Sequence, residues 1–140
     1  MNDNTSLSLL VVAAKKKIAE DIFLFELMHP QGEALPTYTA GAHLPIKTPS
    51  GAMRQYSLCG SPADTDRYWI AVKRESEGRG GSISMTDQLS TGDEIHVGAP
   101  QNLFELSDKA KSFIFIAGGI GITPMMSMIK QLQATEDARP

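Results

Sequence analysis

Cysteine is almost absent from this sequence, because Cys59 is the only one in 140 residues. One cysteine excludes an internal disulfide and also an iron–sulfur cluster held by this chain alone, since such clusters typically take four cysteine ligands. Long apolar runs are lacking as well. Leu9 to Ala14, the longest apolar run near the start, is far shorter than the roughly 20 residues of a membrane span. We therefore expect no membrane partner, no signal peptide and a cytoplasmic location.

An excess of positive charge is also missing. The formal net charge is −3 at pH 7, and Lys15 to Lys17 is the only basic run. Nucleic acid binding requires a clustered basic face, so we expect no nucleic acid partner. We interpret the three lysines as a solvated strand end. His29, His43 and His96 are scattered without metal-ligand spacing, so no metal site is predicted.

Short strand patterns separated by turn residues fill most of the chain. The patterns predict strands over residues 7–14, 21–28, 43–48, 53–59, 67–74 and 94–97, with a short closing strand near Leu103 to Leu106. A helix of one or two turns is expected over Ser82 to Leu89. Strands at this spacing favour an antiparallel barrel or sandwich.

The pattern changes after Lys111. Ser112 to Ala117 is a continuous apolar strand of the buried parallel kind, and a tight loop, Gly118 to Gly121, follows it. Thr123 is a suitable helix N-cap with Pro124 at the first helical position, before a helix over Met125 to Ala134. This order predicts the first βα unit of a doubly wound nucleotide-binding domain.

Two segments carry most of the chemical information. Arg54 and Tyr56 are two apart on a strand and so share a face, which offers a guanidinium for a phosphate and an aromatic ring for stacking. Ser57 follows them, with a hydroxyl that both donates and accepts. Gly78 to Ser82 is a glycine loop opening into a helix, which suits an anion. Together they indicate a flat conjugated ring attached to a phosphate, as in a flavin nucleotide, although either segment alone also fits an ordinary strand or surface turn.

The chain resembles the ferredoxin–NADP reductase superfamily, most closely the phthalate dioxygenase reductase-like branch of Rieske oxygenase reductases. The resemblance covers nearly all of residues 7–135 and rests on several motifs in the same order. These are Tyr38-Thr39-Ala40-Gly41-Ala42-His43-Leu44, Arg54-Gln55-Tyr56-Ser57-Leu58-Cys59, Ala71-Val72-Lys73-Arg74-Glu75, Gly78-Arg79-Gly80-Gly81-Ser82 and Ala117-Gly118-Gly119-Ile120-Gly121-Ile122-Thr123-Pro124.

The resemblance implies a mainly β fold: a six-stranded antiparallel Greek-key flavin-binding barrel with one short helix over residues 1–106. Residues 107–140 would begin an α/β NAD-binding domain with its first βα unit. It also implies hydride transfer from NADH to FMN, and electron transfer from the flavin to an iron–sulfur centre feeding an oxygenase. The natural acceptor would be an oxygenase or ferredoxin component. The family's 2Fe–2S cluster belongs to a C-terminal domain that this chain lacks, so the chain resembles a truncated reductase.

Site residues carry over by their motif positions. Ser57 would lie near flavin N5 as the catalytic residue. The remaining cofactor-binding positions are Arg54, Gln55, Tyr56, Ala71, Val72, Lys73, Gly78, Gly80, Gly81 and Ser82 for the flavin, with Gly119, Gly121 and Thr123 bordering the nicotinamide and pyrophosphate.

Two other interpretations are compatible with many of these sequence features. An FAD-dependent general flavin or ferredoxin reductase keeps the fold, but it needs an adenine platform for which the sequence offers no clear aromatic residue. A non-catalytic remnant would fold, bind flavin and catalyse nothing by itself. Cys59 is interpreted as a small packed side chain, and Met125, Met126 and Met128 as core packing on their helix.

Overall fold

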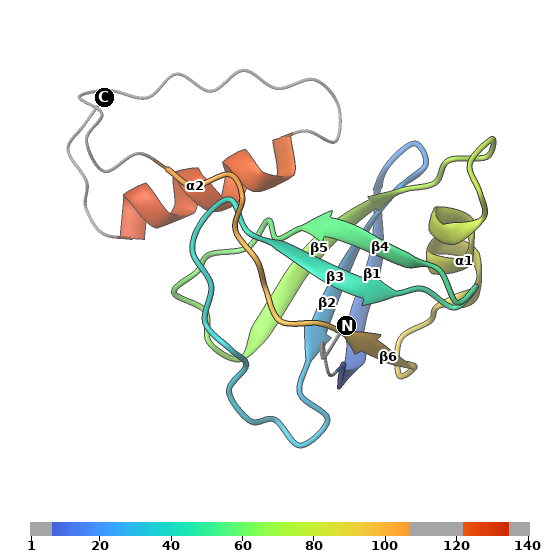
Figure 1. Ribbon diagram of the computed structural model, residues 1–140, viewed down its shortest axis with the longest axis horizontal. Helices are drawn as coiled ribbons and strands as arrows, with labels where there is room; N and C mark the ends of the chain where they lie inside the picture. The colour runs from blue at the N-terminus through green and yellow to red at the C-terminus, as the bar shows by residue number, and fades with distance from the viewer. Residues whose placement is uncertain (1–6, 107–121, 135–140) are drawn as a thin grey trace.

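A computed structural model describes residues 7–106 and 122–134 of the chain (Figure 1). Within them, six strands form one antiparallel sheet in the order β4-β3-β6-β1-β2-β5. The strands are β1 (Ser8–Ala19), β2 (Ile22–Met28), β3 (His43–Lys47), β4 (Met53–Ser57), β5 (Arg67–Lys73) and β6 (Glu94–Val97). Two helices complete the described elements, α1 (Gly81–Gln88) and α2 (Ile122–Ala134).

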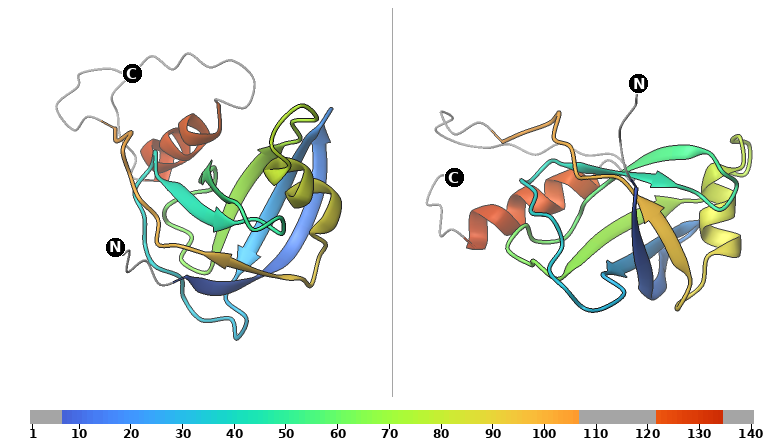
Figure 2. Two further views of the ribbon diagram at one scale, coloured as in Figure 1. Left: turned by 45° about the vertical axis from the view of Figure 1, so that its right-hand side comes forward. Right: turned by 60° about the horizontal axis from the view of Figure 1, so that its bottom comes forward.

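The two edge strands of the sheet, β4 and β5, come together and close it into a barrel (Figure 2). Just beyond β4, Leu58 forms a bridge with Ile70 of β5, and the Cys59 amide donates to the Trp69 carbonyl oxygen at 2.9 Å. The strands themselves do not pair along the rest of their length, so a seam remains between them. The predicted six-stranded antiparallel barrel is confirmed.

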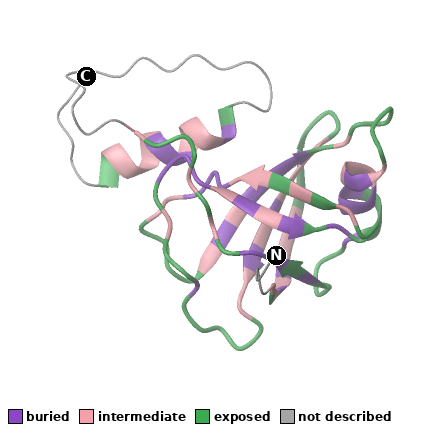
Figure 3. Cartoon of the chain, in the orientation of Figure 1, coloured by how far each residue is buried: buried purple, intermediate pink, exposed green. Residues whose placement is uncertain are grey.

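Apolar residues fill the barrel, and buried positions alternate with more exposed ones along its strands (Figure 3). Strands of an antiparallel sheet present every second side chain to one face, and here many apolar side chains of the inner face are fully or almost fully buried. The largest of them are Phe25, Leu27, Leu44, Ile46, Leu58 and Ile70. Helix α1 covers one end of the barrel and contributes Met85, which is 0% exposed.

The closing strand expected near Leu103 to Leu106 is wrong. Residues 102–106 form no strand, and Leu103 is 87% exposed. The side chain of Asn102 accounts for this, because its Oδ1 accepts the Phe104 amide at 2.8 Å and turns the backbone. Such local side-chain bonds compete with a strand ladder. Strand β6 already fills the sixth position of the sheet.

The lysine run also differs from its prediction. Strand β1 continues to Ala19, and Lys15 is half-buried within it rather than solvated. Its Nζ donates to the carbonyl oxygens of Thr86 at 2.6 Å and Leu89 at 2.8 Å, at the C-terminal end of α1. Lys15 Nζ also lies 5.4 Å from the ring centre of Phe23. Lys15 therefore caps a helix, while Lys16 and Lys17 are exposed.

Helix α2 begins at Ile122, so Thr123 and Pro124 lie in its first turn rather than at a cap and first position. Met128 is buried, in agreement with a packing role. The predicted strand over Ser112 to Ala117 and the loop over Gly118 to Gly121 lie outside the described residues. Among the residues that are described, no helix is both long and apolar enough to cross a membrane.

Candidate functional site

A pocket of about 450 Å³ lies at the seam between β4 and β5, against the start of α1. This volume falls within the usual range of cofactor and ligand sites. Two sheet edges meet here without pairing, so their backbone donors and acceptors face the pocket region. The lining residues are Arg54, Gln55, Tyr56, Ser57, Ala71, Lys73, Glu75, Gly78, Arg79, Gly81, Ser82, Thr123 and Pro124.

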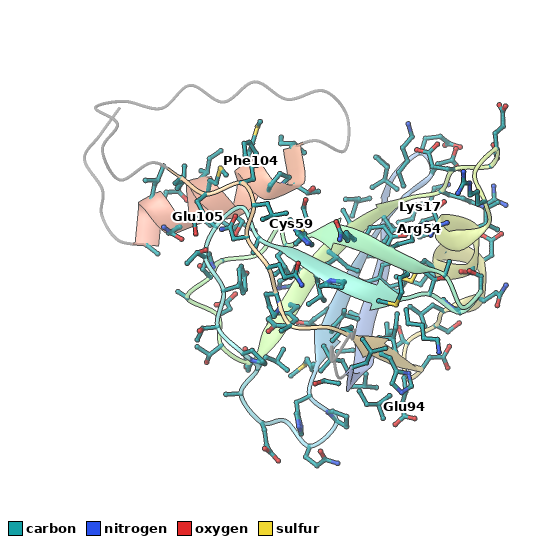
Figure 4. All side chains as sticks on the ribbon, in the orientation of Figure 1. Lys17, Arg54, Cys59, Glu94, Phe104 and Glu105 are labelled. Carbon is teal, nitrogen blue, oxygen red and sulfur yellow. The ribbon has the colours of Figure 1, made fainter. Side chains whose placement is uncertain are left out.

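Arg54 projects from β4 toward α1 (Figure 4). A Cβ atom on Gly81 would lie 2.9 Å from Arg54 Nε and 3.3 Å from Cζ, so a residue larger than glycine would push the guanidinium away from this backbone. Arg54 Nη1 donates to its neighbour, the Met53 carbonyl oxygen, at 2.9 Å. The cation is thereby held beside the beginning of a helix.

That helix start is open to an anion. The residue at its N-cap, Gly80, has φ 95°, and within the described chain no side chain caps the helix. The Glu75 amide donates to Ser82 Oγ at 2.8 Å, which leaves the hydroxyl proton of Ser82 available. Free amides and the positive end of the helix dipole both favour an anion at this position.

The charges around the pocket agree with this geometry. Arg54, Lys73 and Arg79 line it against one carboxylate, Glu75. Next to the pocket, an ion pair between Arg74 and Asp87 joins the end of β5 to α1. Arg74 Nε and Nη2 donate to the two carboxylate oxygens of Asp87 at 3.0 and 2.9 Å. Hydrogen bonding to Arg74 lowers the pKa of Asp87, so this carboxylate stays ionised and keeps Arg74 out of the pocket's charge balance.

Tyr56 and Ser57 end strand β4. Tyr56 is partly buried against the barrel core, and burial raises the pKa of its phenol, so it stays neutral. Arg54 and Tyr56 pair with Ile46 and Leu44 of β3 and share their face of the sheet, as their spacing predicts. Ser57 is the last residue of β4 and lines the same pocket.

Most of the predicted site residues therefore line this one pocket, but a few do not. Val72 is 0% exposed and packs in the barrel core, so its side chain does not line the pocket. Gly80 lies next to the pocket as the N-cap but does not line it. Gly119 and Gly121 lie outside the described residues. Thr123 lines the pocket from the first turn of α2.

Three residues that line the pocket were not among the predicted site residues, namely Glu75, Arg79 and Pro124. The charges in and before the glycine loop were a usable signal for Glu75 and Arg79, since each lies within a few residues of the start of α1. Pro124 gave no such signal, because its place depends on how α2 packs against the barrel.

A larger hollow of about 560 Å³ lies at the other end of β5, near Tyr68, His29 and Glu94. No Lys or Arg is found among its lining residues in the described chain, and Tyr68 donates its hydroxyl proton to the Pro36 carbonyl oxygen. The hollow therefore offers little to a phosphate. The smaller seam pocket, with its three cations and open helix start, is the stronger candidate site.

The barrel and its seam pocket have the form of a flavin-binding domain. The chain belongs to the oxidoreductase FAD-binding domain family, whose model matches residues 9–106. It is 56% identical over 128 residues to the phthalate 4,5-dioxygenase oxygenase reductase subunit of Pseudomonas putida, covering 91% of this chain and 40% of that protein. It is also 56% identical over 125 residues to the phthalate dioxygenase reductase of Burkholderia cepacia, with 89% and 39% covered.

A solved structure of phthalate dioxygenase reductase agrees with the fold. It superposes with a TM-score of 0.91 at 54% identity, over 93% of this chain and 40% of that one. That protein is described as a modular structure for electron transfer from pyridine nucleotides to a 2Fe–2S centre. The resemblance to this branch of reductases is confirmed, and the chain spans about 40% of the length of these relatives.

Proposed function

We propose that the chain is the flavin-binding, electron-transfer part of an NADH-dependent oxidoreductase. In this proposal, electrons pass from NADH through FMN to an iron–sulfur centre that feeds an oxygenase. The observation that carries it is the approach of Arg54 to Gly81, with 2.9 Å between Nε and the position of a Cβ, beside a helix without a side-chain cap in the described chain. The kinship with phthalate dioxygenase reductases supports the electron path.

The residues of the seam pocket fit a flavin mononucleotide. Arg54, the first amides of α1 and the Ser82 hydroxyl would hold the phosphate, with Gly78 and Gly80 allowing the loop to approach it. The edges of β4 and β5 would receive the polar rim of the ring at Gln55, Ala71 and the backbone of Val72 and Lys73. When bound, the flavin supplies two-electron acceptance and one-electron release.

The chain's own residues then orient and shield that ring. Tyr56 provides an aromatic face that is neutral and partly buried, suited to stacking on the ring. Ser57 ends β4 at the pocket, where its hydroxyl would hold the position of N5 by a hydrogen bond. Thr123 and Pro124 border the pocket from α2, on the side from which a nicotinamide would approach.

FMN is proposed over FAD because the pocket offers one phosphate cradle. Glu75 lies beside that cradle and would repel a second phosphate. Among the described residues, Tyr56 is the one aromatic side chain that lines the pocket, so no second ring is available there for an adenine. FAD, which the family name mentions, is the alternative, as in general flavin or ferredoxin reductases.

The wider setting follows from the same proposal. NADH is the proposed donor, an oxygenase or ferredoxin component the acceptor, and the cytoplasm the compartment, where the free thiol of Cys59 would stay reduced. Residues 1–106 form the proposed flavin domain and residues 107–140 the start of the NAD-binding domain. A flavin-binding remnant without catalysis is the remaining alternative for the 140-residue chain.

Titration of the chain with FMN, FAD and riboflavin tests the proposal directly. FMN should quench the fluorescence of the chain at lower concentration than FAD does. Riboflavin, which lacks the phosphate, should bind at least tenfold more weakly than FMN, because one charge-assisted contact contributes about 1.5–3 kcal/mol. Equal affinity for FMN and riboflavin would show that the cradle at Arg54 and Gly81 does not bind the phosphate.

A further inference from the structure

Residues 39–43, here named the junction segment, lie between the barrel, the chain that leaves it and α2. The His43 amide donates to the Gln101 carbonyl oxygen at 2.8 Å, and the Gln101 amide returns a bond to His43 at 3.0 Å. The chain leaving β6 therefore runs along the junction segment before it turns toward α2. Figure 4 places Phe104 and Glu105 on this side of the molecule, close to α2.

Asn102 holds the two segments together. Its Nδ2 donates to Thr39 Oγ1 at 2.6 Å, to the Ala40 carbonyl oxygen at 2.9 Å and to the Thr39 carbonyl oxygen at 3.2 Å. Its Oδ1 accepts the Phe104 amide. One side chain thus satisfies polar groups on both sides of the contact, which is the arrangement that fixes a unique geometry.

Gly41 allows the backbones to approach closely. It has φ 100°, and a Cβ at this position would lie 1.9 Å from the Phe104 carbonyl oxygen and 3.0 Å from Met128 Cε of α2. Phe104 and Met128 therefore both reach the junction segment at the same residue. A glycine here is required by the conformation and by the space.

Helix α2 contacts the same segment. The Ala40 amide donates to Gln131 Oε1 at 3.1 Å. Lys130 Nζ donates to the Cys59 carbonyl oxygen at 3.3 Å, two residues after Ser57. The Leu58 amide in turn donates to the Ala42 carbonyl oxygen at 2.9 Å, so the junction segment also touches the end of β4.

We propose that Asn102 and Gln131 are positioning residues that, through the junction segment, fix α2 against the barrel and so set the entrance for the nicotinamide. The first turn of α2 carries Thr123 and Pro124 into the pocket that Ser57 also lines, so the same contacts fix the distance between these groups. Neither residue lines the pocket. The inference rests on the proposed function and adds how donor access is controlled.

Reduced nicotinamide mononucleotide is the probe, because it carries the nicotinamide and one phosphate without the adenosine half. When bound, the flavin would accept the hydride, that is one proton and two electrons, from the dihydropyridine ring, which would become the pyridinium. Asn102→Asp is nearly isosteric, but it replaces the donor with a carboxylate facing the Thr39 and Ala40 oxygens. Gln101→Glu is the matched control, since it adds the same charge one residue away on an exposed side chain.

The variants are compared in the FMN-loaded 140-residue chain by stopped-flow absorbance. Asn102→Asp should slow flavin reduction by about 10- to 100-fold, the loss expected when reacting groups are displaced by about 1 Å. Its dissociation constant for FMN should remain within about twofold, because Arg54 and the glycine loop are untouched. Gln101→Glu should match the unaltered chain in both measurements.

Helix α2 gives an independent arm. Gln131→Leu removes the acceptor of the Ala40 amide and should slow reduction in the same way, whereas Gln131→Glu keeps an oxygen acceptor and should restore the rate. Hydrogen exchange of the Ala40 amide in the flavin-free chain provides a readout apart from activity. Exchange should accelerate in Asn102→Asp and Gln131→Leu and stay slow in Gln131→Glu.

Three results would overturn the inference, and they are distinguishable. Unchanged reduction rates in both Asn102→Asp and Gln131→Leu, with FMN bound, would remove the positioning role while leaving the proposed function intact. An unaltered chain that binds FMN but is not reduced by the probe would show that this junction does not set an open entrance. Failure to bind FMN at all would instead contradict the proposed function, and the inference with it.

Discussion

Gly81 and Arg54 form the most specific contact of the site at the scale of single residues. A methyl group at position 81 would lie 2.9 Å from Arg54 Nε, so Gly81→Ala must displace the guanidinium. We expect the FMN dissociation constant to rise about tenfold or more, which corresponds to the loss of about 1.5 kcal/mol from one charge-assisted bond. Fluorescence titration measures it. Riboflavin binding should stay the same in this variant, and an equal loss for both ligands would contradict the phosphate role.

Ser57 offers a second residue-level prediction. Ser57→Ala should leave FMN affinity nearly unchanged but slow reduction of the bound flavin and shift its midpoint potential, because one hydrogen bond near N5 is lost. The expected size is about 0.5–1.5 kcal/mol, or roughly twofold to tenfold in rate. A redox titration that coincides with that of the unaltered chain would place Ser57 away from the reactive end of the ring.

Cys59 is buried, and burial raises the pKa of its thiol from 9.0 to about 11, although Lys130 opposes the shift. The unfolded chain loses this proton first, so the free energy of unfolding should decrease as the pH rises from about 9 to about 11 and should not depend on Cys59 below that window. Chemical denaturation of the chain and of Cys59→Ala across this range measures the effect. Identical pH profiles for the two chains would contradict it.

Helix α1 depends on a cation from a distant strand, which makes Lys15 the key test at the scale of elements. Its Nζ donates to two carbonyl oxygens at the end of α1, which has no basic residue in its own last turn. Lys15→Met keeps the apolar stem and removes the charge, and it should lower the free energy of unfolding by about 1–2 kcal/mol. Lys16→Met, on an exposed neighbour, should change it by less than about 0.5 kcal/mol. Equal effects of the two variants would contradict the capping role.

Elements and site were predictable from the sequence to different extents. The strands followed from alternation, and the seam pocket from local motifs, because Arg54, Tyr56 and the glycine loop each carry their chemistry within a few residues. The missing strand near Leu103 was not predictable, since the Asn102 side chain that accepts the Phe104 amide is held by Thr39 and Ala40, 63 and 62 residues away. Lys15 was misread for the same reason, because its acceptors lie 71 and 74 residues along the chain.

The candidate site shows the same difference between local motifs, which the sequence reveals, and contacts between distant residues, which it does not. Residues on β4 and in the glycine loop were identified, whereas the role of α2 at the pocket depends on contacts such as Ala40 with Gln131, 91 residues apart. Val72 was assigned to the site by its motif, but the strand's alternation turns its side chain into the core. Motifs thus locate chemistry, while packing decides which atoms reach it.

At the scale of the whole molecule, the 140-residue chain should bind FMN yet oxidise NADH slowly. A dinucleotide binds at the switch point between successive strands of a doubly wound sheet, and this sequence predicts one such strand. NADH should therefore be no better a donor than reduced nicotinamide mononucleotide at equal concentration. Stopped-flow mixing compares the two, and rapid bleaching of the flavin at micromolar NADH would contradict the expectation.

The seam between β4 and β5 has a consequence for the lifetime of the protein in a cell. In the described part of the chain, the two sheet edges are joined beside the pocket by the bridge of Leu58 with Ile70, so we expect a chain without its cofactor to open there. A ligand that binds only the folded form adds about 2.7 kcal/mol of stability at one hundred times its dissociation constant. We expect proteases to degrade the cofactor-free chain by cutting near this seam. The supply of riboflavin, and not only the rate of protein synthesis, would then govern how much of the protein accumulates.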